Sequence, residues 1–124
     1  MSNSFIQRNQ GRVYLVAEID IYKCLTNNGM YKEFDEAFSF PPTTNYGSLD
    51  VLLDYMRDLG WQKIKNYKIV LTNLDKANKK DVDEVREVID FLEIVKEYWD
   101  REKLRLNKRF EYDFIVEFYL DKSE

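Results

Sequence analysis

Three aspartates, Asp50, Asp54 and Asp58, stand four residues apart in the middle of the chain. On a helix, this spacing places them on one face, about one turn apart. Like charges so spaced cost a helix roughly 0.2–0.5 kcal/mol per pair, so folding gives no reason for the arrangement. Such carboxylates could bind a cationic protein surface, hold a hard cation, or act as an acid–base pair.

The remaining residue types argue against catalysis. The chain has no histidine, so the commonest general base is absent. Its single cysteine, Cys24, has no histidine to activate it, and we expect a small buried apolar side chain there. The four glycines are too scattered for a phosphate-binding loop, and no cysteine–histidine spacing suits a metal. Carboxylates alone remain, and one helical face offers few convergent oxygens. We therefore predict a protein that is not an enzyme and needs no cofactor or metal.

A helix that begins after Ser48 is predicted to carry the aspartates. Two prolines and Gly47 break the chain before it, and Ser48 is a suitable N-cap. Gly60 is the predicted residue that ends it. Apolar residues recur at helical spacing along its other face: Leu49, Leu52, Leu53, Met56 and Leu59. Asp50 would lie in the first turn, where the helix dipole favours a carboxylate by ~0.3–1 kcal/mol. A purely structural reason for Asp50, and an ordinary solvated acidic face for Asp54 and Asp58, stay open.

Hydrophobic periodicity predicts the other elements. Residues 1–11 are polar and are expected to be a loose extension. The predicted elements after them are a strand over 13–22, a turn at 27–29, a short helix over 30–40, the acidic helix over 49–59, a strand over 68–74, a polar loop or helical turn over 75–83, a long helix from 82 to 102 or beyond, and a strand over 110–120.

Strands separated by helical crossovers favour a parallel sheet. We predict an α/β fold in which a small three-stranded parallel sheet packs with about three to four helices. The length of 124 residues suits one domain, placed at 12–124 after the extension at 1–11. No apolar run is long enough to span a membrane, the first residues lack the apolar core of a secretion signal, and the lone cysteine suits a reducing compartment. We expect a cytoplasmic protein.

The stretch around the acidic helix resembles the barstar family of ribonuclease inhibitors. The matching residues are Pro42, Tyr46, Gly47, Ser48, Leu49, Asp50, Leu52 and Asp54. The likeness continues upstream over 34–40 and downstream through Trp61 to the apolar run at 69–71. Three departures stand out: the tyrosine–glycine pair is one residue closer to the helix, Leu53 replaces a usual aromatic residue, and the linker before Trp61 is longer.

This resemblance implies a barstar-like fold and a protein that blocks the basic active site of a ribonuclease with an acidic helix and loop. It implies contacts to the partner from Asp50 and Asp54, with further candidates at Tyr46, Gly47, Ser48 and Asp58, and a second acidic contact at Glu97 and Asp100. Trp61 is expected to pack in the core. The partner is a barnase-like ribonuclease or another toxin nuclease rather than nucleic acid, because the net charge is −4.

Two alternatives to ribonuclease inhibition stay open. One is a structural or self-assembly module that keeps the barstar fold and buries the acidic helix between copies. The other is an immunity protein for a different toxin nuclease. We expect a monomer with the acidic helix exposed.

Overall fold

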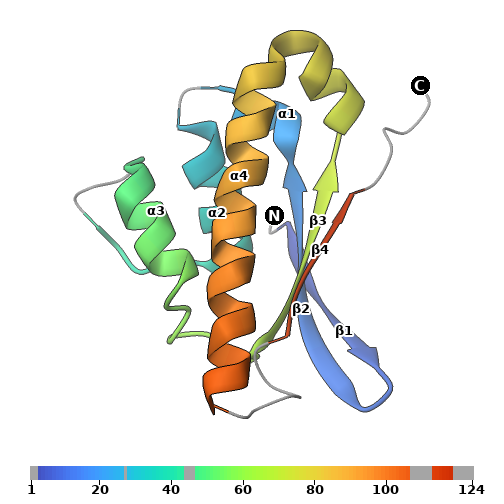
Figure 1. Ribbon diagram of the computed structural model, residues 1–124, viewed down its shortest axis with the longest axis vertical. Helices are drawn as coiled ribbons and strands as arrows, with labels where there is room; N and C mark the ends of the chain where they lie inside the picture. The colour runs from blue at the N-terminus through green and yellow to red at the C-terminus, as the bar shows by residue number, and fades with distance from the viewer. Residues whose placement is uncertain (1–2, 27, 44–46, 107–112, 119–124) are drawn as a thin grey trace.

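The computed structural model describes residues 3–26, 28–43, 47–106 and 113–118 (Figure 1). Four strands form one sheet in the order β1-β2-β3-β4. Their bounds are Ser4–Asn9, Arg12–Asp20, Asn66–Thr72 and Phe114–Phe118. The three strands from β2 to β4 are mutually parallel, which confirms the α/β class and the parallel core of the sheet.

The fourth strand, β1, was not predicted, and the expectation of a loose extension and a three-stranded sheet was wrong. β1 runs antiparallel to β2. Between them, Gln10 and Gly11 both have positive φ, at 52° and 80°, as a two-residue type I′ hairpin turn requires. The residues of β1 show little hydrophobic alternation, and all of them except Ser4 are exposed, so neither face of the strand is buried. Pairing with β2, rather than local pattern, makes this segment a strand.

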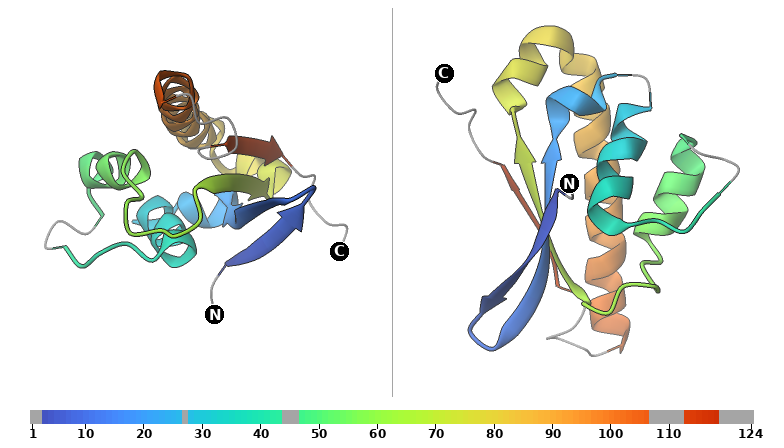
Figure 2. Two further views of the ribbon diagram at one scale, coloured as in Figure 1. Left: turned by 90° about the horizontal axis from the view of Figure 1, so that it is seen from below. Right: turned by 180° about the vertical axis from the view of Figure 1, so that it is seen from behind.

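All helices cover one face of the sheet (Figure 2). The alternation predicted for the first strand is confirmed: Leu15, Ala17 and Ile19 face the helices and belong to the main core. The opposite face carries a small separate cluster of Tyr14, Val16 and Val70, packed with Ile115. The strand itself ends at Asp20, two residues earlier than predicted.

Four helices complete the described part of the fold. Their bounds are Ile21–Cys24 for α1, Gly29–Phe38 for α2, Leu49–Met56 for α3 and Leu74–Leu106 for α4. The periodicity of the sequence predicted α2 and α3, but α1 was taken as the end of a strand. The side chain of Asp20 ends the strand by accepting hydrogen bonds from the backbone N–H groups of Tyr22 and Lys23, at 3.0 and 3.4 Å.

α4 contains a kink at Asp81, whose backbone is extended (φ −161°, ψ 91°). Asp81 Oδ1 accepts from the backbone N–H of Glu84 at 3.1 Å and so caps the second, longer part. The open question about residues 75–83 is thereby answered, because the part before Asp81 is helical. Helical periodicity predicts a buried stripe of Val85, Val88, Ile89, Leu92, Val95 and Trp99 on the long part. All of them are buried except Ile89, which is half-buried.

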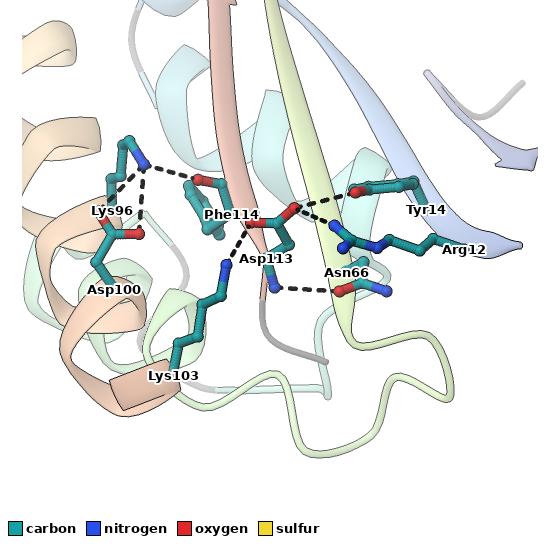
Figure 3. A network of polar contacts seen from close by, with 8 residues as sticks. All are labelled: Arg12, Tyr14, Asn66, Lys96, Asp100, Lys103, Asp113 and Phe114. Carbon is teal, nitrogen blue, oxygen red and sulfur yellow. Dashed lines mark hydrogen bonds and ion pairs between the residues drawn. The ribbon is translucent and has the colours of Figure 1, made fainter. Parts of the chain in front are cut away.

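A polar network centred on Asp113, the residue before β4, joins that strand to its neighbours (Figure 3). Asp113 Oδ2 accepts from the Tyr14 hydroxyl at 3.0 Å and lies 3.6 Å from Arg12 Nη1. Its Oδ1 pairs with Lys103 Nζ at 3.2 Å, and its backbone N–H donates to Asn66 Oδ1 at 3.1 Å. The carboxylate of Asp113 thus connects the start of β4 with β2 and α4, and its backbone N–H connects it with β3.

The described part of the last predicted strand, 114–118, pairs in parallel with β3. The predicted residues 110–112 and 119–120 lie outside the described part of the chain. Among the described residues, no helix has the length and apolar character needed to cross a membrane.

Candidate functional site

α3 begins where the sequence predicted. Ser48 has extended backbone angles, and its Oγ accepts from the Val51 N–H at 3.4 Å. Leu52 and Met56 are fully buried, so the opposite face of the helix points outward. At its C-terminal end, the Met56 carbonyl accepts from the indole N–H of Trp99 at 2.7 Å, which ties α3 to α4.

The end of α3 differs from the prediction. The helix stops at Met56, and Leu59, with φ of 50°, takes the left-handed conformation that was expected of Gly60. Leu59 is fully buried, so tertiary packing holds a leucine in a conformation that local preference disfavours. Asp58 consequently lies beyond the helix, where its Oδ1 accepts from the Gly60 N–H at 3.2 Å.

Asp50 and Asp54 both project into solvent from α3, one turn apart, which is about 6 Å along the axis. The Asp54 side chain is 73% exposed and lies 3.3 Å from Arg57 Nη2. A surface pair of this kind contributes about 0–1 kcal/mol, so a partner can displace it. No lysine or arginine of the described residues forms an ion pair with Asp50. Both carboxylates are available for intermolecular contact.

The loop before α3 approaches the start of α2. Gly47 has a φ of 91°, and a Cβ at this position would lie 2.5 Å from Asn28 Oδ1. The positive φ favours glycine here, and any Cβ would also displace the Asn28 side chain, so Gly47 has a structural role whether or not it touches a partner. Tyr46, a predicted contact residue, lies outside the described part of the chain.

Three aromatic side chains pack together where the chain leaves α2, around residues 38–41. Phe40 and Tyr55 have ring centroids 4.9 Å apart, and Trp61 lies edge-on to both at 5.9 and 5.5 Å. The Tyr55 hydroxyl donates to the Pro41 carbonyl at 3.2 Å, and the Trp61 indole donates to the Phe38 carbonyl at 2.8 Å. The packing expected of Trp61 is confirmed. The sequence did not predict that Tyr55, the residue after Asp54, packs in this aromatic cluster.

Glu97 and Asp100 do not lie beside the α3 aspartates. Asp100 pairs with Lys96 at 3.1 Å, and Lys96 also donates to the Phe114 carbonyl at 3.0 Å (Figure 3). Asp100 is therefore on the side of α4 that faces β4, whereas the neighbouring Trp99 reaches α3. Glu97 is 70% exposed and lies 3.7 Å from Arg101. The two acids form a separate patch.

Other α4 carboxylates occupy the place beside α3. Glu84 and Glu87 line a pocket of about 240 Å³ together with Gly47 and Leu49. Leu49 was predicted to be on the apolar face but is 59% exposed at the rim of this pocket. Glu84 and Glu87 are exposed residues of the long helix, and no local signal in the sequence connected them to α3.

The chemistry of this region favours binding over catalysis. Cys24 lines the same pocket, but burial raises the pKa of its thiol, and the nearby carboxylates of Glu33 and Asp20 raise it further. The thiol is therefore protonated and a poor nucleophile. Within the described ranges, no group of three or more His, Cys, Asp or Glu side chains could hold a metal ion.

Comparison with known proteins bears on this acidic surface. A family model described as Barstar (barnase inhibitor) matches residues 14–111. The matched range contains all four helices and both α3 aspartates, while β1 lies outside it. No curated protein and no solved structure gives a significant match. Because the matched range covers most of the chain and includes the elements that form the surface, the chain belongs to the barstar family.

Proposed function

We propose that this protein inhibits a ribonuclease by occupying its RNA-binding cleft with the exposed acidic face of α3. Family membership supports the class of activity. The observation that carries the proposal is the exposure of Asp50 and Asp54 on a capped helix whose other face is buried. A ribonuclease binds phosphates with cationic side chains, and carboxylates at the phosphate positions would accept charge-assisted hydrogen bonds from them.

The surroundings of α3 suit this role. The Ser48 cap, the Tyr55–Pro41 hydrogen bond and the Trp99–Met56 hydrogen bond hold the helix before any partner arrives. Such preorganisation reduces the entropy lost on binding. Glu84 and Glu87 add negative potential on the neighbouring helix, which would attract a basic enzyme and speed encounter.

The proposed contacts have a clear order of importance. Asp54 and Asp50 are the main contacts, and the loop residues Tyr46, Gly47 and Ser48, together with Asp58, flank them. Glu97 and Asp100 would contact a partner only if it also reaches around α4. The proposed setting is the cytoplasm, and the proposed partner is a barnase-like ribonuclease or another toxin nuclease.

The direct test is a panel of purified basic ribonucleases and toxin nucleases, barnase included, measured by calorimetry and by inhibition of nucleic-acid cleavage. For the nuclease that binds, Asp54→Ala should weaken affinity about 30-fold or more. This follows from the ~2–5 kcal/mol lost when one partner of a buried interfacial charge pair is removed, a range known from other interfaces, the barnase–barstar complex among them.

Asp90→Ala is the matched control, because Asp90 is an exposed carboxylate of α4 that does not line the pocket at Leu49. Its affinity should equal that of the wild type. Equal affinities for Asp54→Ala and Asp90→Ala would refute the proposed surface. Light scattering measures whether the chain forms a stable oligomer. An oligomer that buries α3 would instead favour an assembly module.

A further inference from the structure

β1 forms an exposed edge of the sheet. In the strand order it is outermost, and no other described strand pairs with its outer side. Phe5 is 48% exposed and Ile6 is 58% exposed. β1 lies far from α3 (Figure 2) and outside the range matched by the family. Edge strands offer unpaired backbone groups to other chains, and proteins usually protect them with proline, lysine or a bulge. β1 contains no proline, lysine or bulge, and its one charged side chain is Arg8.

The register shows which backbone groups are available. The Glu18 N–H donates to the Asn3 carbonyl at 2.8 Å, next to the Ser4–Ala17 pair. Hydrogen-bonded positions alternate along an antiparallel strand, so residues 3, 5, 7 and 9 bond to β2. The N–H and C=O groups of Ile6 and Arg8 therefore point toward the free edge.

We propose that β1 is a dimerisation edge, where it pairs antiparallel with β1 of a second copy of this chain across a two-fold axis at Ile6. The two-fold axis is perpendicular to the sheet and passes between two copies of the same residue. The two β1 strands then run antiparallel, and the same face of the sheet points the same way in both copies. An axis at Ile6 also brings the outward-pointing groups of both copies together.

Side-chain chemistry favours this register. Ile6 would oppose Ile6 of the second copy, and Phe5 would lie diagonal to Phe5 of the second copy, within reach for an aromatic contact. Arg8 is the one charged residue of β1, and it would oppose Ser4, so no like charges meet. Both exposed apolar side chains of the strand would thus be covered by their own copies.

This proposal is independent of the proposed inhibitory function. β1 and α3 lie at opposite ends of the molecule (Figure 2), so a dimer joined through β1 leaves Asp50 and Asp54 exposed in both copies. A failed nuclease screen would not affect it, and a monomeric chain would not affect the inhibitor proposal.

Sedimentation of the full chain over a wide concentration range tests the proposal. The expected result is a mass that rises from 15.0 kDa toward twice that value. A single strand junction is smaller than a standard interface of about 1,200 Å² or more, so the dissociation constant should lie between about 1 μM and 1 mM. Ile6→Lys would place two ammonium groups opposite each other and should weaken the dimer about tenfold or more.

Ile94→Lys is the matched control, since Ile94 is a 51% exposed isoleucine on α4; its dimer should match that of the wild type. Ile6→Cys gives a readout that does not depend on weak association. Residues paired across the axis have Cα atoms about 5.5 Å apart, which suits a disulfide. Oxidation should therefore give a covalent dimer with Ile6→Cys and none with Ile94→Cys.

Two results would overturn the proposal: a wild-type chain that stays monomeric at about 1 mM, or a dimer that Ile6→Lys does not weaken. In the first case the edge would be free for a strand of a different protein, and in the second the dimer would use another surface.

Discussion

Asp50 and Asp54 share a face of α3 but differ in what they contribute to folding. Asp50 lies in the first turn, close to the positive end of the helix dipole, whereas Asp54 lies a turn further on and, among the described residues, forms an ion pair with Arg57 at the surface. The dipole falls off within one turn. Removal of Asp50 should therefore affect both stability and partner binding, whereas removal of Asp54 should affect partner binding alone.

Asp50→Ala should lower the free energy of unfolding by ~0.3–1 kcal/mol and also weaken nuclease binding. Asp54→Ala should weaken binding with little change in stability, because a surface ion pair contributes so little. Urea denaturation of both variants, alongside calorimetric binding, checks this. Equal losses of stability in the two variants would contradict the distinction.

Glu33 provides a second prediction at the scale of a single residue. Its side chain is only 7% exposed, and its Oε1 accepts from the Asp20 N–H at 2.9 Å. Burial raises the pKa of this carboxyl above its ordinary value of 4.5, and the hydrogen bond from Asp20 and the charge of Lys23 offset the rise only in part. The folded protein therefore holds this proton to a higher pH than the unfolded chain does.

The contribution of protonated Glu33 to stability is present below pH 4.5 and is lost as pH rises through the raised pKa. Glu33→Gln keeps an acceptor for the Asp20 N–H without the charge. The stability of Glu33→Gln relative to wild type should increase with pH across this window and then level off. Denaturation at a series of pH values measures the difference, with the exposed Glu93→Gln as control. A difference that does not vary with pH would contradict the assignment.

At the scale of the element, β4 is attached beyond its sheet hydrogen bonds by the buried Phe114 and by the side chain of Asp113, the residue before it. Asp113 connects it to Tyr14, Arg12 and Lys103 (Figure 3), and its side chain is only 20% exposed. The guanidinium of Arg12, the ammonium of Lys103 and the hydroxyl of Tyr14 share this carboxylate. Removing it therefore removes one polar partner from each of the three groups.

Asp113→Ala should destabilise the protein by about 2–3 kcal/mol, because hydrogen bonds to a charged group contribute more than neutral ones and partly buried partners lose their acceptor. Asp113→Asn keeps one acceptor oxygen and should lose less. Thermal and urea denaturation measure both. The exposed Asp100→Ala, whose Lys96 partner keeps a bond to the Phe114 carbonyl, should stay close to wild type. An Asp113→Ala variant as stable as Asp100→Ala would show that the network contributes little.

At the scale of the whole molecule, charge should govern the rate of association. The chain has 23 acidic and 19 basic residues. α3 exposes Asp50 and Asp54, and Glu84 and Glu87 of α4 line the pocket at Leu49, the first residue of α3. For a basic nuclease, the association rate constant should fall steeply as salt rises, because the screening length is only ~10 Å at 0.1 M. The dissociation rate constant should change much less. Stopped-flow mixing at several salt concentrations measures both, and an association rate that is independent of salt would exclude electrostatic steering.

Local sequence determined the elements whose information is short-range. The Ser48 cap, the buried stripe of α4 and the alternation of β2 follow from neighbours within one or two turns or pleats. β1 was missed because its partner lies across a hairpin and its own residues carry no pattern. The end of α3 was misplaced because the burial of Leu59 overrides the ordinary preference for glycine at positive φ.

The candidate site divides in the same way. The sequence alone determined that α3 presents Asp50 and Asp54 on its outer face, because helical periodicity sets which residues share a face. Only the tertiary structure decided which α4 carboxylates lie beside the start of α3. The direction of a helix face depends on packing, and the contact of Trp99 with Met56 turns α4 so that Glu84 and Glu87 border the pocket at Leu49 while Asp100 faces β4.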